Sequence, residues 1–201
     1  MTTSSTSAPK RGPYAKSKQR RENIVIAAHE VFAKHGYKGG SLQVVADRVG
    51  MSQTSLLHYF PSKSALLLAV LNWRDTVTGD GGSRSPEESL ASAVIRQARF
   101  NETVPGVVEL YTVLCAESLT AKHPGRDYFT QRYEGLRRSY SRSFTALARE
   151  GRLRPGVDPE RAAASLIALW DGIQTQWLME PDSVDMAQCL QDYLDFLILP
   201  E

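Results

Sequence analysis

The stretch Ser41–Lys63, SLQVVADRVGMSQTSLLHYFPSK, contains two short helical patterns separated by a glycine. In the first pattern, Ser41 can cap a helix whose apolar residues recur at positions i, i+3, i+4 and i+7, namely Leu42, Val45, Ala46 and Val49. Gly50 follows, where a helix end favours a left-handed backbone and a side chain is costly. The pattern predicts a short amphipathic helix that ends at this glycine.

A second helix is predicted from Gln53 to about Tyr59, with Ser52 as its cap. Pro61 ends it, and Ser62 can cap a third helix that begins at Lys63. Two helices joined by a short glycine-containing turn are the helix-turn-helix arrangement, whose second helix enters the major groove of DNA. With Leu56 and Phe60 pointing inward, the residues left to face DNA are Gln53, Thr54, Ser55, His58 and Tyr59.

The charge distribution supports a nucleic-acid partner. Residues 1–63 carry ten Lys and Arg against three acidic residues, a net of +7, whereas the whole chain is +2, which leaves −5 for residues 64–201. DNA phosphates attract the first part and repel the second, so the two halves orient the protein on a duplex. Charges spread by chance over a solvated surface are the alternative interpretation.

The segment from about Gln19 to Trp73 resembles the DNA-binding domain of the tetracycline-repressor (TetR) family. This resemblance implies a three-helix DNA-binding domain followed by a helical sensor domain, a homodimer, and repression that a small ligand relieves. It covers about a quarter of the chain, and the residues that carry it outside the turn are Ile24, Ala27, Ala28, Phe32, Gly36, Tyr37, Leu56, Phe60, Ser62, Lys63 and Leu66.

The motif departs from the family pattern at a few positions. Members often have Tyr where this chain has Leu57, and His where it has Tyr59. Leu57 cannot donate a hydrogen bond to a phosphate, so this contact is expected to pass to His58, Tyr59 or Lys63. Members also often carry Glu where Ser64 stands, a favourable helix-dipole contribution of roughly 0.5 kcal/mol that does not put the fold in doubt.

Length and composition suit one small and one medium helical domain, because 201 residues with 42% hydrophobic content can bury a core. We expect a cytoplasmic protein with no membrane contact, since no apolar run approaches a bilayer span and the first residues lack the apolar centre of a signal peptide. No metal, cofactor or catalytic residue is expected. Cys115 and Cys189 are isolated, and the four histidines are scattered.

The chain is expected to divide into a disordered basic arm over 1–16, a helix-turn-helix domain over 17–78, a junction over 79–86, and a ligand-binding and dimerisation domain over 87–201. Lys10 and Arg11 in the arm resemble basic segments that reach along a neighbouring minor groove, although a solubilising tail fits equally well. The predicted DNA contacts outside the second helix are Lys10, Arg11, Lys18, Ser41, Ser52 and Lys63.

Beyond residue 86 every segment has a helical pattern, with helices expected near 87–103, 106–121, 127–150, 159–179 and 184–198. Tyrosines among their apolar residues suggest a cavity for a largely apolar or aromatic ligand, and the acidic body argues weakly against an anionic one unless arginines such as Arg96, Arg99 or Arg137 are buried. Simple core packing is the alternative. The predicted lining residues are Phe100, Tyr111, Leu114, Cys115, Tyr133, Leu136, Tyr140, Trp170, Gln174 and Trp177.

The last two predicted helices each carry two apolar stripes, which indicates two packing partners, the sensor core and the same helices of a second chain. A longer core that wraps both helices is the alternative. The residues predicted at the dimer interface are Leu169, Gly172, Gln176, Met186, Cys189, Tyr193 and Phe196.

The sequence therefore predicts an all-α, ligand-responsive regulator that binds an operator in double-stranded DNA as a homodimer, most simply as a repressor. A transcriptional activator and a sequence-indifferent architectural DNA-binding protein are the alternatives. A helical enzyme or ligand carrier is disfavoured, since the sequence has no phosphate-binding glycine loop, metal-ligand cluster or nucleophile motif.

Overall fold

The computed structural model describes residues 13–78, 85 and 88–200, which form nine α-helices and no strand beyond an isolated bridge between Leu153 and Ile198. The predicted all-α class is confirmed. In chain order the helices are α1 (Pro13–Gly39), α2 (Leu42–Arg48), α3 (Gln53–Tyr59), α4 (Lys63–Thr78), α5 (Leu90–Glu102), α6 (Pro105–Ser118), α7 (Arg126–Arg149), α8 (Pro159–Met179) and α9 (Met186–Leu197).

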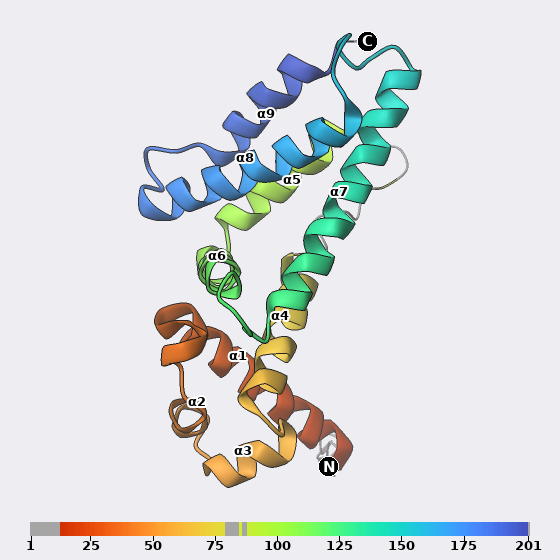
Figure 1. Ribbon diagram of the computed structural model, residues 1–201. Coiled ribbons are helices and arrows are strands. Elements are labelled where there is room, and N and C mark those ends of the chain that lie inside the picture. The colour runs from red at the N-terminus through yellow and green to blue at the C-terminus, as the bar shows by residue number, and fades with distance from the viewer. Residues whose placement is uncertain (1–12, 79–84, 86–87, 201) are drawn as a thin grey trace, which may run out of the picture.

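The helices form two regions that α4 and α6 connect (Figure 1). One end holds α1, α2 and α3, and the other holds α5, α8 and α9 with most of α7. The C-terminus lies at the end opposite α2 and α3. None of the described helices is both long and apolar enough to cross a bilayer.

Helix α1 begins earlier than expected. It starts at Pro13, a residue whose fixed φ suits a first helical position, so 13–16 are helical and their assignment to a disordered arm is wrong. The rest of the predicted arm, including Lys10 and Arg11, lies outside the described residues. Gly36 interrupts α1 with φ 66° and ψ 178°, a positive φ that glycine adopts without strain.

The predicted capping pattern of the helix-turn-helix is confirmed. Ser41 accepts a hydrogen bond from the Val44 amide and Ser52 accepts one from the Ser55 amide, as N-caps of α2 and α3. Gly50 has φ +66°, the left-handed conformation expected between the helices. Ser62 accepts from the Ala65 amide at 3.0 Å and so begins α4.

The hydrophobic core does not follow the predicted domain boundary. The core of α1–α4 also contains Leu110, Tyr111 and Leu114 from α6 and Phe129 from α7. A second core joins α5, α8 and α9 with Val108 and the later part of α7. The α6 helix therefore packs into both regions, and the DNA-binding part is in direct contact with the sensor.

Candidate nucleic-acid interface and sensor cavity

The outer face of α3 matches the predicted DNA-reading surface. Gln53, Thr54, Ser55 and His58 are exposed, while Leu56 is buried. The Ser55 hydroxyl lies 2.9 Å from that of Ser52, so it is already engaged in the helix cap. The freely projecting polar groups are consequently Gln53, Thr54 and His58, and Gln53 at the helix start has the amide suited to pair with adenine.

Tyr59 differs from the other predicted reading residues because it is half-buried and packs against the core of α1–α4. Its backbone carbonyl accepts a hydrogen bond of 2.7 Å from Arg21 Nη1. Any contribution of this side chain to reading DNA is therefore limited to its outer edge.

Arg20 and Arg21 on α1 hold the helix-turn-helix together, a role that counting charges did not reveal. The Arg20 Nη1 donates to the Val49 carbonyl at the end of α2, over 3.3 Å. The Arg21 guanidinium carbon lies 4.1 Å from the Phe60 ring centroid, beside its hydrogen bond to the last carbonyl of α3. Cations placed at C-terminal helix ends satisfy orphan carbonyls and oppose the negative end of the dipole.

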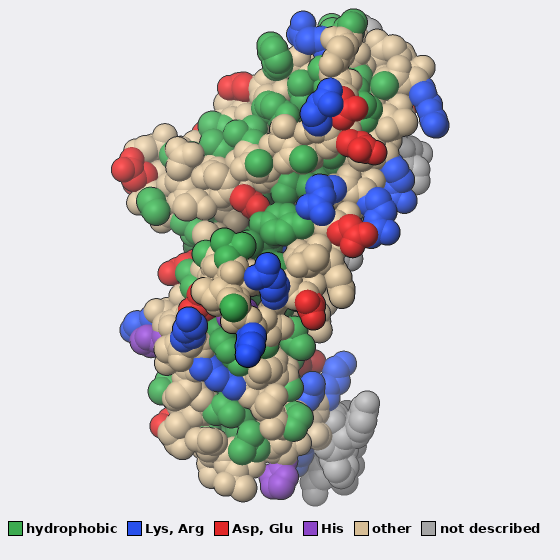
Figure 2. All heavy atoms as spheres, in the orientation of Figure 1, with side chains coloured by type: hydrophobic (Ala, Val, Ile, Leu, Met, Phe, Trp, Pro, Cys, Tyr) green, Lys and Arg blue, Asp and Glu red, His purple; other side chains and the backbone are tan. Residues whose placement is uncertain are grey.

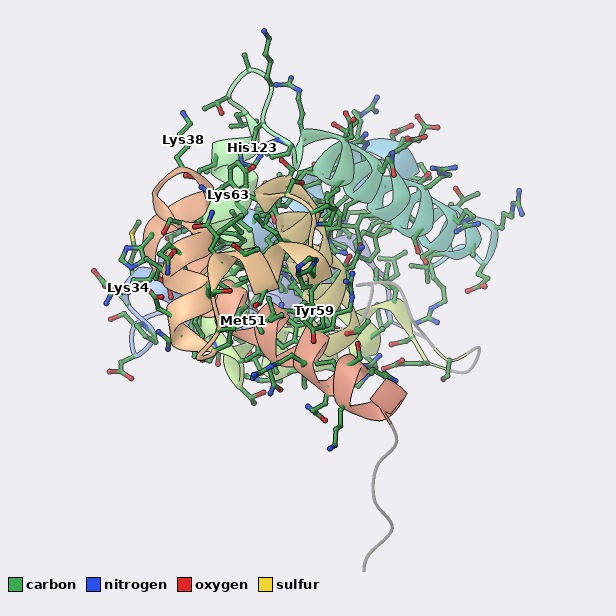
Figure 3. All side chains as sticks on the ribbon, turned by 90° about the horizontal axis from the view of Figure 1, so that it is seen from below. Lys34, Lys38, Met51, Tyr59, Lys63 and His123 are labelled. Carbon is green, nitrogen blue, oxygen red and sulfur yellow. The ribbon has the colours of Figure 1, made fainter. Side chains whose placement is uncertain are left out.

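Lys63 points to the end of α1. Its Nζ donates to the Lys38 carbonyl at 3.2 Å and lies 4.6 Å from the Tyr37 ring centroid. Burial lowers the pKa of Lys63. Lys38, Lys63 and His123 gather at one edge of the DNA-binding part, away from Tyr59 (Figure 3). Lys63 is thus engaged with the end of α1, whereas Lys18 and Lys38 are exposed.

A cavity lies where α4, α5, α6, α7 and α8 meet, with about 460 Å³ of empty space including its open mouth. Among the residues predicted to bind a ligand, Tyr111, Leu136, Tyr140, Trp170 and Gln174 line it. Gln174 is held in place, because its Nε2 donates to Thr112 at 3.0 Å and its Oε1 accepts from the Trp170 indole at 3.2 Å.

The remaining predicted ligand-binding residues do not line the cavity. Phe100 is 39% exposed on the outside of α5, whereas Leu114 and Trp177 are buried in the two cores. Cys115 and Tyr133 lie behind the wall, with the sulfur 3.2 Å from the phenol oxygen. An apolar stripe shows which side of a helix is covered, but not whether a neighbouring side chain or an empty space covers it.

The polar residues of the cavity wall were not predicted from the sequence. The arginines singled out in the sequence, Arg96, Arg99 and Arg137, are all exposed, whereas Arg74 is buried and the side chain of Arg132 is only 11% exposed. A signal was present, because Arg74 continues the i, i+3, i+4, i+7 series of Leu67, Val70 and Leu71. The cavity residues that were not predicted from the sequence are Arg74, Thr78, Gln97, Asn101, Arg132, Ile167 and Asp171.

Asp75 joins the two buried arginines. Its Oδ1 lies 3.1 Å from Arg74 Nη1 and 2.9 Å from Arg132 Nη1, and its Oδ2 accepts a hydrogen bond of 2.7 Å from Tyr128. Burial lowers the pKa of Arg74. Burial also tends to lower the pKa of Arg132. The negative charge of Asp75 opposes this effect, and the pKa of Arg132 is raised. This cluster ties α4 to α7.

A second carboxylate, Asp171, faces the cavity from α8. It accepts a hydrogen bond of 2.6 Å from the Tyr133 phenol. Burial raises the pKa of Asp171. The wall thus carries both signs of charge, with Arg74 and Arg132 on one side and Asp171 on the other.

The predicted dimer face is only partly at the surface. Gly172, Gln176 and Phe196 are exposed, the last by 64%, and Leu169, Cys189 and Tyr193 are half-buried. Met186 has no exposed surface because it packs inside the core of the sensor, so its assignment to the interface is wrong. Figure 2 shows hydrophobic side chains at the surface over α8 and α9.

Within the described residues, no group of His, Cys, Asp or Glu is arranged to hold a metal ion.

Comparison with known proteins agrees with this architecture along most of the chain. Residues 24–70 match the family model for bacterial regulatory proteins of the tetR family, and residues 86–198 match the model for the C-terminal part of BetI-type transcriptional repressors. The chain is 28% identical over 192 residues to the HTH-type transcriptional regulator TtgR of Pseudomonas putida, covering 89% of this chain and 90% of that protein.

Two solved structures share the fold. The triclosan complex of SmeT, the repressor of the Stenotrophomonas maltophilia multidrug efflux pump SmeDEF, superimposes with a TM-score of 0.74 at 19% identity, over 90% of this chain and 92% of that one. A transcriptional regulator from Saccharomonospora viridis in complex with choline superimposes with a TM-score of 0.74 at 20% identity, over 91% and 100%.

Proposed function

The chain belongs to the tetR family of bacterial regulatory proteins, and we propose that it is a homodimeric repressor that a small ligand releases from a partly palindromic DNA operator. In a dimer, two copies of α3 would enter successive major grooves. Gln53, Thr54 and His58 would contact base edges or phosphates, and exposed lysines of α1 would add sequence-independent affinity. Such a protein works in the cytoplasm, where the DNA is.

The observation that carries this proposal is the position of the sensor cavity. Its wall includes Arg74 and Thr78 of α4, the helix that begins directly after the helix-turn-helix. A ligand in the cavity therefore contacts the same helix that positions α3. Occupancy would favour a different α4 orientation, provided that the ligand binds this orientation more tightly than the DNA-competent one.

The dimer proposal rests on the exposed face of α8 and α9. A small residue, Gly172, lies on this face with no heavy atom within 4 Å of the place where a Cβ would be. Small residues allow two helices to approach closely, and exposed apolar residues such as Phe196 favour covering by a partner. The same face on a second copy would give an isologous interface.

The proposal can be tested by selecting bound sequences from a random duplex pool with the full-length protein at near-physiological salt. Enrichment of an inverted repeat is expected. Salt-sensitive binding without enrichment would instead favour an architectural protein. If the protein binds no duplex, either alone or with metabolites from a cell extract added, a DNA-binding role is contradicted. A reporter gene placed behind the enriched repeat then separates a repressor, which lowers expression, from an activator.

A further inference from the structure

The cavity wall contains two buried arginines whose Nε groups have no hydrogen-bond partner. These are Arg74, whose side chain is 4% exposed, and Arg132, whose side chain is 11% exposed. A buried donor without an acceptor is unfavourable, and more so in a charged group. Because both residues line the cavity, a ligand with acceptor oxygens is able to satisfy these donors.

The two guanidinium groups are close enough to meet one ligand group. Their Nη1 atoms lie 3.1 Å and 2.9 Å from the same oxygen of Asp75. Asp75 is a single carboxylate shared by two arginines, and it also accepts from Tyr128. Asp171 bonds to Tyr133 and forms no ion pair in the described part of the chain. In the described part of the chain, Asp75 is the one carboxylate paired with these two arginines, so a ligand carboxylate would add a second acceptor group beside them.

One aromatic residue of the wall, Tyr111, is not available to a cationic ligand. The ring of Tyr111 is already covered, with the guanidinium carbons of Arg74 and Arg132 at 4.2 Å and 5.4 Å from its centroid. A cationic ligand would have to displace these groups and lie beside their like charge. Trp170, Leu136 and Ile167 remain available to pack against a flat apolar body.

We propose that the effector is a small organic anion, a carboxylate attached to a flat apolar group, whose oxygens accept hydrogen bonds from Arg74 and Arg132. This inference rests on the proposed function, because it names the ligand class of the same sensor. The carboxylate competes with Asp75 for both arginines. Since Arg74 and Asp75 belong to α4 and Arg132 to α7, ligand binding rearranges the connection between these two helices.

The size of the cavity limits the effector. The empty volume of about 460 Å³ includes the open mouth, so the enclosed part is smaller than this figure. A large ligand would therefore have to separate the helices. A single aromatic ring with one acidic group is the appropriate first probe.

The test compares three probes that share one ring and differ in charge, namely benzoate, benzamide and benzylammonium. Binding to the full-length protein is measured by calorimetry and by the shift of the thermal unfolding midpoint. Benzoate is expected to bind at least tenfold more tightly than benzamide, a difference of about 1.4 kcal/mol, and benzylammonium is expected to bind most weakly. Equal binding of the three probes, or no benzoate binding at millimolar concentration, overturns the proposal.

Variants then assign the preference to the arginines. Arg132→Gln and Arg74→Gln are expected to remove the difference between benzoate and benzamide. Arg137→Gln, an exposed arginine on the same helix as Arg132, is the control and should retain it. If both cavity variants fold and still bind benzoate more tightly than benzamide, the arginines are not the source of the preference. If one variant does not fold, the other variant and the wild-type probe series decide.

Operator binding without any probe is measured on the same samples, so that the two proposals fail separately. Loss of operator recognition with an intact preference for benzoate would refute the regulator proposal alone. Operator recognition without a preference for the anion would refute only the ligand class.

Discussion

The carboxylate of Glu117 on α6 accepts a hydrogen bond of 2.5 Å from the backbone amide of Tyr37 at the end of α1. It also occupies the space beside Gly36, where an added Cβ would clash with Glu117 Oε1. The His123 ring packs edge-on against Tyr37, with the centroids 5.0 Å apart. This contact fastens the end of α1 to the sensor, next to the start of α4, whose Lys63 and Ser64 also contact Tyr37.

Replacing Glu117 with Gln should weaken this connection, because a neutral amide oxygen is a weaker acceptor than a carboxylate. We expect a loss of about 1 kcal/mol in the free energy of unfolding, measured by urea denaturation, and a smaller ligand-induced change in operator affinity. The exposed Glu109 on the same helix provides the control variant Glu109→Gln. Equal effects of the two substitutions would show that the Tyr37 contact contributes nothing.

Alanine at Gly36 should be more destabilising than alanine at Gly50. Both glycines have φ +66°, which costs an alanine about 1–3 kcal/mol, and Gly36 combines it with a ψ of 178°, a region essentially restricted to glycine. Only at Gly36 does Glu117 occupy the space that a Cβ would take, since no heavy atom lies within 4 Å of a Cβ built on Gly50. Urea denaturation of both variants measures the difference. Adding Glu117→Ala to Gly36→Ala should recover part of the excess cost, and strictly additive losses would contradict the steric explanation.

Alanine at Gln53 should reduce discrimination between the selected operator and a mismatched duplex by about 1–3 kcal/mol, because a bidentate contact to a base is lost. Competition binding at fixed salt measures this ratio. Gln43, exposed on α2, donates to Asp47 on its own helix, and Gln43→Ala is the matched control. If Gln53→Ala weakens binding to all duplexes equally, this side chain contacts the DNA backbone rather than a base.

Arginine at Gly172 should convert the dimer into a monomer, because a long charged side chain would occupy the proposed interface of α8. Light scattering after size-exclusion chromatography measures the mass, and operator affinity should fall with it. Gly135 on α7 is also exposed, with nothing within 4 Å of the place where a Cβ would be, so Gly135→Arg is the control. A dimeric Gly172→Arg protein would place the interface elsewhere.

Stability should fall as the pH drops below about 6.5, the ordinary value for His29. Burial lowers the pKa of His29, although its hydrogen bond to the Gly106 carbonyl and the charges of Glu30 and Glu109 oppose the shift. The unfolded chain therefore binds the proton more tightly, and the loss begins near the unfolded pKa and is complete below the folded one.

Urea denaturation between pH 5 and pH 7.5, a range of about one unit or more on each side of the unfolded histidine value, measures this slope. His29→Gln keeps a donor for the Gly106 carbonyl and should flatten the curve. Burial also lowers the pKa of His123, which accounts for a remaining slope of the same sign. His35→Gln on the same helix is the control. An unchanged slope in His29→Gln would assign the effect to other groups.

The local features of the fold were readable from the residues. Ser41, Gly50, Ser52 and Ser62 each act through groups a few positions away, so their pattern predicts the turn without any knowledge of distant contacts. The outward position of Gln53 follows equally from helical periodicity. The sequence by itself therefore determined the helix-turn-helix, the all-α class and most helix ends.

Tertiary structure decided what each buried face touches. Periodicity assigns Met186 and Leu114 to covered positions but does not say whether a partner chain, a ligand or the core covers them. Arg74 and Arg132 are charged, and only the packing of α4, α6 and α7 around Asp75 and Tyr111 shows why they are buried. Such burial depends on helices far apart in the chain, so no local pattern contains it.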